Sequence, residues 1–271
     1  MRLVVTTLNV GLWAALYLKS TLRQVAPTVE RPFVLGLPTG ETVLEMYAML
    51  RTLAKQRALD YQHLITFNMD EYVGIPADHP QSYHAYMRRN LFDYVPIPRS
   101  HIFIPNGQAA DLPAECARYE HEIARAHGMN LLIGGIGRNG HIAFNEPGTP
   151  FHTRTHVVEL TPSTLEANAR FFGGDESRVP RRAITMGIGT ILDAKELLFL
   201  ASGVQKAAAV EHLLTQKPTL DWPITAIHLH PHATLVADTD ACILLSGELK
   251  TRLDEARAQN PHADEWILEI E

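Results

Sequence analysis

The sequence predicts an α/β protein with a mostly parallel central sheet flanked by helices. Short apolar runs alternate with helical patterns along the chain, which is typical of parallel sheets whose crossover connections are helices. Several apolar runs end in glycine or polar residues just where a helical pattern begins. With 46% hydrophobic and 20% charged residues, the composition is that of an ordinary globular protein.

The predicted elements follow one another in a regular order. Residues 1–18 predict a strand and then an amphipathic helix. Further strands are expected at residues 33–37, 63–72, 101–107, 129–137 and 194–201, which are short apolar runs bounded by turn residues. Helices are expected at residues 38–54, 80–91, 112–126 and 204–214. Residues 153–182 break this rhythm, which predicts an insertion over the sheet.

The chain length favours a single domain. Its 271 residues suffice for one large domain with a sizeable core. The sequence contains no internal repeat, low-complexity segment or linker that would divide it. We therefore expect one domain over residues 1–271, ending in a charged tail at 248–271.

Charge and cysteine content narrow the class of protein. The net charge of -6 leaves no basic excess to neutralise phosphates, so a nucleic-acid partner is not expected. No apolar run reaches the length of a membrane span, and the N-terminal segment has Asn9 and Gly11 inside it and no cleavage site after it. Cys116 and Cys242 lie far apart without a metal-binding spacing, which favours buried thiols in a reducing compartment. The expected location is the cytoplasm, with no membrane contact.

Three chemically rich segments follow predicted strands: LPTGET, NMDEY and GGIGRNGH. In open α/β sheets, ligands bind outside the carboxyl ends of the strands. The three segments are therefore expected to meet in one cleft.

LPTGET joins a strand to a helix, where free backbone N–H groups favour an anion such as phosphate. Glu41 would repel a phosphate unless its side chain points to solvent. The alternative is a plain turn in which Thr42 and Glu45 form a capping box, which needs no ligand.

NMDEY places Asp70 and Glu71 at a strand end. Because side chains alternate along a strand, only one carboxylate is expected to enter the cleft. A partly desolvated carboxylate there would have a raised pKa and could act as a general base. Helix capping or a surface salt bridge is the alternative interpretation.

GGIGRNGHIAFNEPG places His141 and Glu146 on either side of a turn. A carboxylate that accepts from one imidazole nitrogen fixes the tautomer and raises the basicity of the other nitrogen. This pair is typical of an acid/base histidine. A glycine-rich loop with a structural histidine is the alternative.

Two later basic residues, Arg170 and Lys206, could clamp a phosphate, the arginine as a fork and the lysine as a point charge. Solvated surface charges are the alternative. Alternation would place the three histidines of HLHPH on one strand face. Because Pro231 interrupts the run and no carboxylate or cysteine cluster accompanies it, no metal site is expected.

Taken in order, these segments resemble the glucosamine-6-phosphate deaminase family, also called the glucosamine-6-phosphate isomerases. LGLPTG, TFNMDEYVG, HPQSYHAYM, GGIGRNGHIAFNEPG, ANARFF and SGVQKAAA carry the resemblance, which runs to about residue 247. It implies a Rossmann-like fold, a mobile helical lid at about 160–180 and no cofactor. The implied reaction converts glucosamine 6-phosphate and water to fructose 6-phosphate and ammonia in amino-sugar catabolism.

The resemblance also implies residue roles. Asp70 matches the base that moves a proton between C2 and C1, and His141 matches the ring-opening catalyst that Glu146 orients. Asn139 stands where many members carry an aspartate that assists ring opening, although some members carry asparagine. The positions that match the phosphate site are Thr39, Gly40, Glu41, Thr42, Arg170 and Lys206.

One departure concerns regulation and assembly. Several members are hexamers activated by N-acetylglucosamine 6-phosphate, which an arginine and a lysine bind at a subunit interface. This chain has His156 and Val158 in those places. Weak or absent activation is therefore expected. A homo-oligomer is possible, but the sequence does not decide the oligomeric state.

Three alternatives remain for the function. 6-Phosphogluconolactonases resemble the chain in the GxGxxGH loop, but the glutamate of IAFNEP and the NMDEY segment favour a deaminase. A non-catalytic sugar-phosphate sensor would keep the phosphate clamp and lose the acid/base residues, which are present here. Galactosamine 6-phosphate remains open as the substrate because no motif identifies the residues that contact the C4 hydroxyl.

Overall fold

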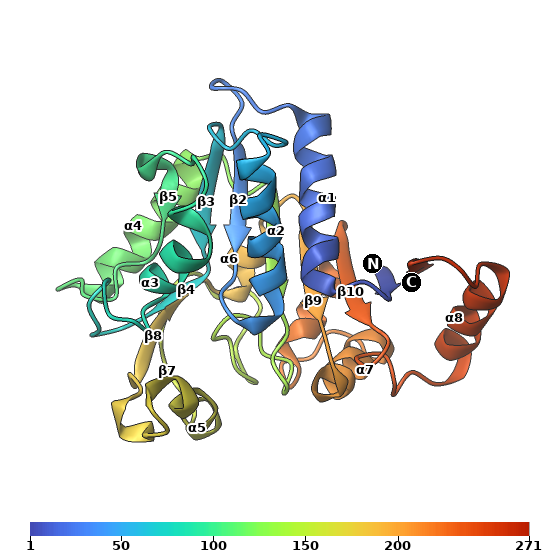
Figure 1. The fold of residues 1–271 in the computed structure, drawn as a ribbon. Coiled ribbons are helices and arrows are strands. Elements are labelled where there is room, and N and C mark those ends of the chain that lie inside the picture. Colours follow the sequence, from blue (N-terminus) through green and yellow to red (C-terminus); the bar gives the residue numbers. More distant parts are fainter. Residues whose placement is uncertain (271) are drawn as a thin grey trace.

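The computed structural model describes residues 1–270 and confirms a mostly parallel sheet flanked by helices (Figure 1). The strands are β1 (Arg2–Thr6), β2 (Phe33–Leu37), β3 (Leu64–Asn68), β4 (Asp70–Tyr72), β5 (Ile102–Phe103), β6 (Leu131–Gly135), β7 (His156–Glu159), β8 (Arg182–Thr185), β9 (Leu197–Ala201), β10 (Ala233–Asp238) and β11 (Glu265–Glu269). The helices are α1 (Val10–Val25), α2 (Leu44–Lys55), α3 (Tyr83–Met87), α4 (Leu112–Arg125), α5 (Pro162–Ala169), α6 (Ile188–Leu192), α7 (Ala207–Thr215) and α8 (Gly247–Gln259).

The main sheet has eight strands in the order β11-β1-β10-β9-β6-β2-β3-β5. Every neighbouring pair is parallel except β11 with β1, which is antiparallel. The parallel strands β3, β2, β6 and β9 are therefore neighbours whose carboxyl ends share one edge.

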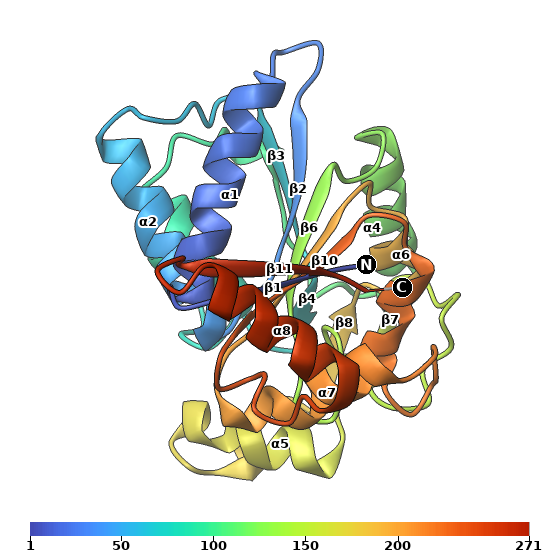
Figure 2. The ribbon, with the colours of Figure 1, turned by 90° about the vertical axis from the view of Figure 1, so that its right-hand side faces the viewer.

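Helices cover both faces of this sheet (Figure 2). Because side chains alternate along a strand, β1 sends Leu3 and Val5 to one core and Val4 to the other. Buried side chains of α1 and α2 pack on the Val4 side, and those of α4, α6 and α7 pack on the opposite side. Burial on both faces explains why these strands read as continuous apolar runs.

Local sequence explains where the first helices lie. The Asn9 side chain accepts hydrogen bonds from the backbone N–H groups of Gly11 and Leu12, which caps the start of α1. At Gly11 an added Cβ would lie 2.9 Å from the Met46 backbone nitrogen. Glycine therefore allows α1 and α2 to approach closely.

The predicted insertion forms a second, smaller layer. Strands β4, β8 and β7 make an antiparallel sheet that extends with α5 beyond the carboxyl ends of the main sheet (Figure 1). This layer has its own apolar cluster, which includes Tyr72, Phe144, Leu165 and Phe172. It covers the edge where the three chemically rich segments end.

The structure adds detail to two segments of the second half of the chain. The charged tail at 248–271 includes most of α8 and the edge strand β11, whose alternation buries Trp266 and Leu268 and exposes its charged residues. Glu271 lies outside the described residues. The strand prediction for HLHPH was wrong, because Pro223–Leu229 forms a 3₁₀ helix and β10 begins only after Pro231.

Several other expectations can be compared with the fold. His230 is buried, and its Nε2 atom lies 2.7 Å from the Ala194 carbonyl oxygen. This hydrogen bond gives the ring a structural role. Residues 1–270 contain no cluster of three or more side chains suited to hold a metal ion. The thiols of Cys116 and Cys242 are buried and unpaired, as predicted. Within residues 1–270, every helix is too short or too polar to cross a bilayer.

Candidate active site

Asp70 is the first residue of β4 and pairs across the small sheet with Thr185 of β8. Its side chain is buried, and the Oδ1 atom has no hydrogen-bond partner among residues 1–270. Burial raises the pKa of Asp70 to about 8, and the neighbouring charge of Glu71 adds to this effect. This is the raised-pKa carboxylate that the sequence pattern predicted.

Glu71 has a different environment. Its carboxylate accepts hydrogen bonds from the backbone N–H groups of Tyr83 and His84 at the start of α3. The Nδ1 atom of His84 also lies 2.8 Å from Glu71 Oε2. Glu71 therefore caps a helix, while Asp70 remains unpaired, so each interpretation of NMDEY applies to one residue.

His141 lies in the glycine-rich loop that follows β6. The backbone N–H of Gly137 donates to the His141 carbonyl, and a Cβ at Gly137 would lie 2.3 Å from the imidazole ring. Only glycine leaves room for the ring at that position. Burial lowers the pKa of His141, Glu146 raises it and Lys206 lowers it further, so the neutral form is favoured.

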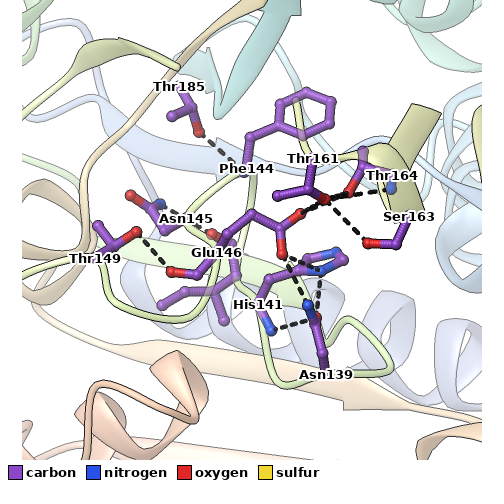
Figure 3. Close-up of polar contacts among 11 residues, drawn as sticks. Asn139, His141, Phe144, Asn145, Glu146, Thr149, Thr161, Ser163, Thr164 and Thr185 are labelled. Atoms are coloured by element: carbon purple, nitrogen blue, oxygen red, sulfur yellow. Dashed lines mark hydrogen bonds and ion pairs between the residues drawn. The ribbon is translucent and has the colours of Figure 1, made fainter. Parts of the chain in front are cut away.

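Asn139 lies between His141 and Glu146 (Figure 3). Its Oδ1 atom is 2.7 Å from His141 Nδ1, and its Nδ2 atom donates to Glu146 Oε2 at 2.8 Å. Glu146 Oε2 itself is 3.8 Å from His141 Nδ1. The expectation that Glu146 accepts a hydrogen bond from the ring is therefore corrected, because Glu146 lies beyond hydrogen-bond distance and Asn139 bridges the two groups.

The hydrogen-bonding capacities of these groups fix the histidine tautomer. An ionised Glu146 can only accept hydrogen bonds, so the amide N–H₂ of Asn139 must face it. The amide oxygen then faces His141, and since an amide oxygen only accepts, Nδ1 must carry the ring hydrogen. Nε2 is left unprotonated and can take a proton from a ligand.

Glu146 has further partners that sequence analysis missed. The Thr164 hydroxyl donates to Glu146 Oε1 at 2.6 Å, and the Thr161 hydroxyl lies 3.3 Å from the same atom. Thr161 also caps α5. The sequence signals the cap, because TPST starts a helical pattern, but it gives no sign of the contact with Glu146.

The loop after β2 forms a turn without the predicted capping box. Gly40 has a φ of 116°, and a 3₁₀ helix at Glu41–Val43 leads into α2. Neither helix start has a side-chain cap, so the predicted Thr42–Glu45 capping box is absent. The Tyr86 hydroxyl donates to the Gly40 carbonyl at 2.6 Å and holds the turn in place.

Positive side chains gather beside this turn. Lys206 ends a 3₁₀ helix at the start of α7, and burial lowers its pKa. The charges of Arg138 and Arg170 lower it further, while Glu41 has the opposite effect. Arg170 Nη2 lies 3.3 Å from Glu41 Oε2. Arg170, Lys206 and the Glu41 turn are therefore neighbours, and Arg138 is a further cation that sequence analysis missed.

Together these groups suit acid/base chemistry on an anionic ligand. One buried carboxylate has no partner, one histidine has a free nitrogen, and a group of cations lies beside a helix start. Burial raises the pKa of Asp70 and lowers the pKa of His141, and such shifted values are typical of active sites.

Comparisons with known proteins identify the family of this chain. A family model described as glucosamine-6-phosphate isomerases/6-phosphogluconolactonase matches residues 13–236. A glucosamine-6-phosphate deaminase of Cronobacter sakazakii is 45% identical over 263 residues, which cover 96% of this chain and 98% of that protein. The deaminase of Tolumonas auensis is 49% identical over 237 residues, or 88% of this chain and 89% of that protein.

Solved structures give the same grouping. A structure described as a monomeric glucosamine-6-phosphate deaminase has a TM-score of 0.85 and 42% identity, covering 90% of this chain and 100% of that one. A 6-phosphogluconolactonase from Thermotoga maritima has a TM-score of 0.68 at 19% identity, covering 87% and 98%, which shows a common fold. The chain therefore belongs to the family of glucosamine-6-phosphate isomerases and 6-phosphogluconolactonases, where it groups with the glucosamine-6-phosphate deaminases.

Proposed function

We propose that this protein is a glucosamine-6-phosphate deaminase. It converts glucosamine 6-phosphate and water to fructose 6-phosphate and ammonia in amino-sugar catabolism. The observation that carries the proposal is the unpaired, buried carboxylate of Asp70 on the small sheet, accompanied by a histidine with an unprotonated Nε2. The relatives named deaminases that are 45–49% identical support it.

The proposed chemistry begins with ring opening. His141 Nε2 takes the proton from the hydroxyl at C1 and returns it to the ring oxygen, so the C1–O5 bond breaks and an aldehyde forms at C1. Asn139 holds Nδ1–H during this exchange, and Glu146 holds Asn139. A neutral imidazole can make both transfers because its pKa is lowered by burial.

The second step moves a proton between neighbouring carbons. Asp70, when ionised, takes the C2 proton. The C2–H electrons form a C1=C2 double bond, and the carbonyl oxygen at C1 takes a proton from the substrate ammonium group, which gives an enolamine. The same carboxyl then returns its proton to C1, and the nitrogen lone pair forms an iminium at C2. Water adds to C2, one of its protons passes to the nitrogen and the other to solvent, and the C–N bond breaks to release ammonia and the ketone of fructose 6-phosphate. The low-polarity surroundings of Asp70 strengthen it as a base.

We assign the substrate phosphate to the cations beside the turn that follows β2. Arg170 and Lys206 would bind its oxygens, and backbone groups of residues 39–42 would complete the site. Arg170 follows α5, so residues 160–180 would act as a lid that brings it over the substrate. The lid and the main sheet would form one domain.

Assembly and location are also proposals. We place the protein in the cytoplasm, where its two buried thiols stay reduced, with a small sugar phosphate as its ligand and no nucleic-acid partner. Because His156 and Val158 cannot supply two cations, activation by N-acetylglucosamine 6-phosphate should be weak or absent. A homo-oligomer stays open.

The test is ammonia release from glucosamine 6-phosphate, with galactosamine 6-phosphate and 6-phosphogluconolactone assayed in parallel. Release from glucosamine 6-phosphate with formation of fructose 6-phosphate would establish the proposal. Release from galactosamine 6-phosphate alone would move the protein to the other C4 epimer. Binding without turnover of any of the three would indicate a sensor instead of an enzyme.

A further inference from the structure

The carboxylate of Glu146 is held from two sides by different parts of the chain. Asn139, in the loop after β6, donates to Oε2 at 2.8 Å. Thr164, on α5, donates to Oε1 at 2.6 Å. Figure 3 shows the carboxylate between these two groups, with His141 on the Asn139 side.

The surroundings make these two donors important for Glu146. Its side chain is 13% exposed, so bulk water contributes little to its solvation. Within residues 1–270, the Glu146 carboxylate pairs with His141, at 3.8 Å, and forms no ion pair with a lysine or arginine. Uncharged donors must therefore satisfy the carboxylate oxygens, and Thr164 makes the shortest of these contacts.

We propose that Thr164 is a positioning residue whose hydroxyl holds Glu146, and through Glu146 the tautomer of His141. The inference rests on the proposed function and extends it to the lid. Thr164 belongs to α5. The hydrogen bonds that hold Nδ1–H of His141 are therefore complete only when α5 lies against Glu146. Movement of the lid and protonation of the histidine are thereby linked.

The physical link runs through the direction of each hydrogen bond. An ionised Glu146 forces the Asn139 amide to present its oxygen to Nδ1–H. Without the Thr164 hydroxyl, Glu146 loses its shortest hydrogen bond and can turn away from Asn139. The amide is then free to turn, and its N–H₂ group would favour a ring with hydrogen on Nε2.

The charged groups that act on His141 are unchanged in a Thr164 variant. Glu146 raises the pKa of the ring and Lys206 lowers it. A ring with hydrogen on Nε2 cannot accept a proton at that atom, so the change of tautomer should lower kcat at every pH.

The test compares Thr164→Val, which keeps the volume and removes the hydroxyl, with Thr164→Ser, which keeps the hydroxyl. Thr161 is less suitable because its side chain also caps α5. For Thr164→Val, kcat with glucosamine 6-phosphate should fall roughly fivefold to tenfold, and KM should change little. Thr164→Ser should restore kcat.

A matched control is Ser177→Ala, which removes another hydroxyl of the proposed lid. Ser177 donates to Asp175 within its own turn. The control should behave as the unmodified protein. Unchanged kcat in Thr164→Val, or failure of Thr164→Ser to restore it, would overturn the proposal.

A second readout does not depend on turnover. Nitrogen NMR of the labelled protein distinguishes hydrogen on Nδ1 from hydrogen on Nε2 of His141. We expect the Nδ1–H form in the unmodified protein and in Thr164→Ser, with a rise of the Nε2–H form in Thr164→Val. If the unmodified protein failed to release ammonia, the proposed function would fall, while this measurement would still decide whether Thr164 sets the tautomer.

Discussion

The two sides of the site differ in how their charged groups are held. On the acid/base side, Asp70 and Glu146 are buried or nearly so, and Glu146 is held by several hydrogen bonds. On the anion side, the Glu41 and Arg170 side chains are 64% and 59% exposed and contact each other. The difference indicates that the acid/base side is preorganised, whereas on the other side Arg170 is paired with Glu41 and must leave it to bind the phosphate we propose there.

Substitutions on the two sides of the site should change different kinetic constants. Changes on the buried side should act on kcat and on the pH profile, because we propose that those residues transfer protons or hold a residue that does. Changes on the exposed side should act mainly on KM, because we propose that those residues bind a phosphate that does not react.

The largest effect is expected for Asp70→Asn. Loss of the base should reduce kcat by about a thousandfold, measured as the rate of ammonia release. In the unmodified protein, kcat/KM should rise with pH until Asp70 is ionised, at about 8. A variant that keeps more than a tenth of the rate would exclude Asp70 as the base.

The same variant should be more stable. Because the folded-state pKa of Asp70 is raised, the folded state binds a proton more tightly than the unfolded chain, and stability is lost as pH rises from about 4 towards about 8. Asp70→Asn removes this loss, so the free energy of unfolding should exceed that of the parent by about 2–5 kcal/mol at about pH 9. Denaturant unfolding at about pH 5 and about pH 9 should show the difference growing with pH.

The next effect is expected for Lys206→Ala, which removes a partly buried cation from the phosphate site. KM should rise roughly tenfold to a hundredfold, the value of a hydrogen bond to a charged group, with a smaller change in kcat. Initial rates over a range of substrate concentrations measure both. Lys195→Ala, at an exposed lysine, is the control, and a fall in kcat at constant KM would contradict the assignment.

A smaller effect is expected for Asn139→Asp. A carboxylate 2.7 Å from Nδ1 would raise the pKa of His141, so the midpoint of its ring titration, followed by NMR, should move to higher pH by about one unit. Glu146, which now accepts from the amide, would face a second carboxylate. Superimposable titration curves of the two proteins would show that Asn139 does not control the histidine.

The smallest effect is expected for Glu41→Gln. An exposed ion pair contributes little, so freeing Arg170 should lower KM by about twofold to fivefold and leave kcat unchanged. Glu45→Gln tests a nearby exposed carboxylate. Equal effects of the two substitutions would mean that Glu41 acts only through general charge.

Much of the main sheet could be predicted because its strands are apolar runs followed by turn residues. The grouping of Asp70 and His141 at strand ends followed from that order. The small sheet was harder, since β4, β7 and β8 have only three or four residues each and pair across distant segments. Local patterns cannot show such pairing.

The contacts within the site were also beyond sequence reasoning. Glu146 meets Thr164, and Glu41 meets Arg170, only because the chain returns to the same edge. The capping box at Thr42 was expected from spacing, but the backbone of Gly40 starts a 3₁₀ turn there instead. Residue types revealed the candidate groups, while their partners depended on tertiary structure.

The position of β1 bears on how the protein is made in the cell. This strand pairs with β10 and β11, which begin at Ala233 and Glu265. During synthesis, β1 must wait without strand partners until almost the entire chain has left the ribosome, and its apolar residues need protection for that time. Chaperones should therefore affect the yield of folded protein mainly during the long interval before β10 emerges.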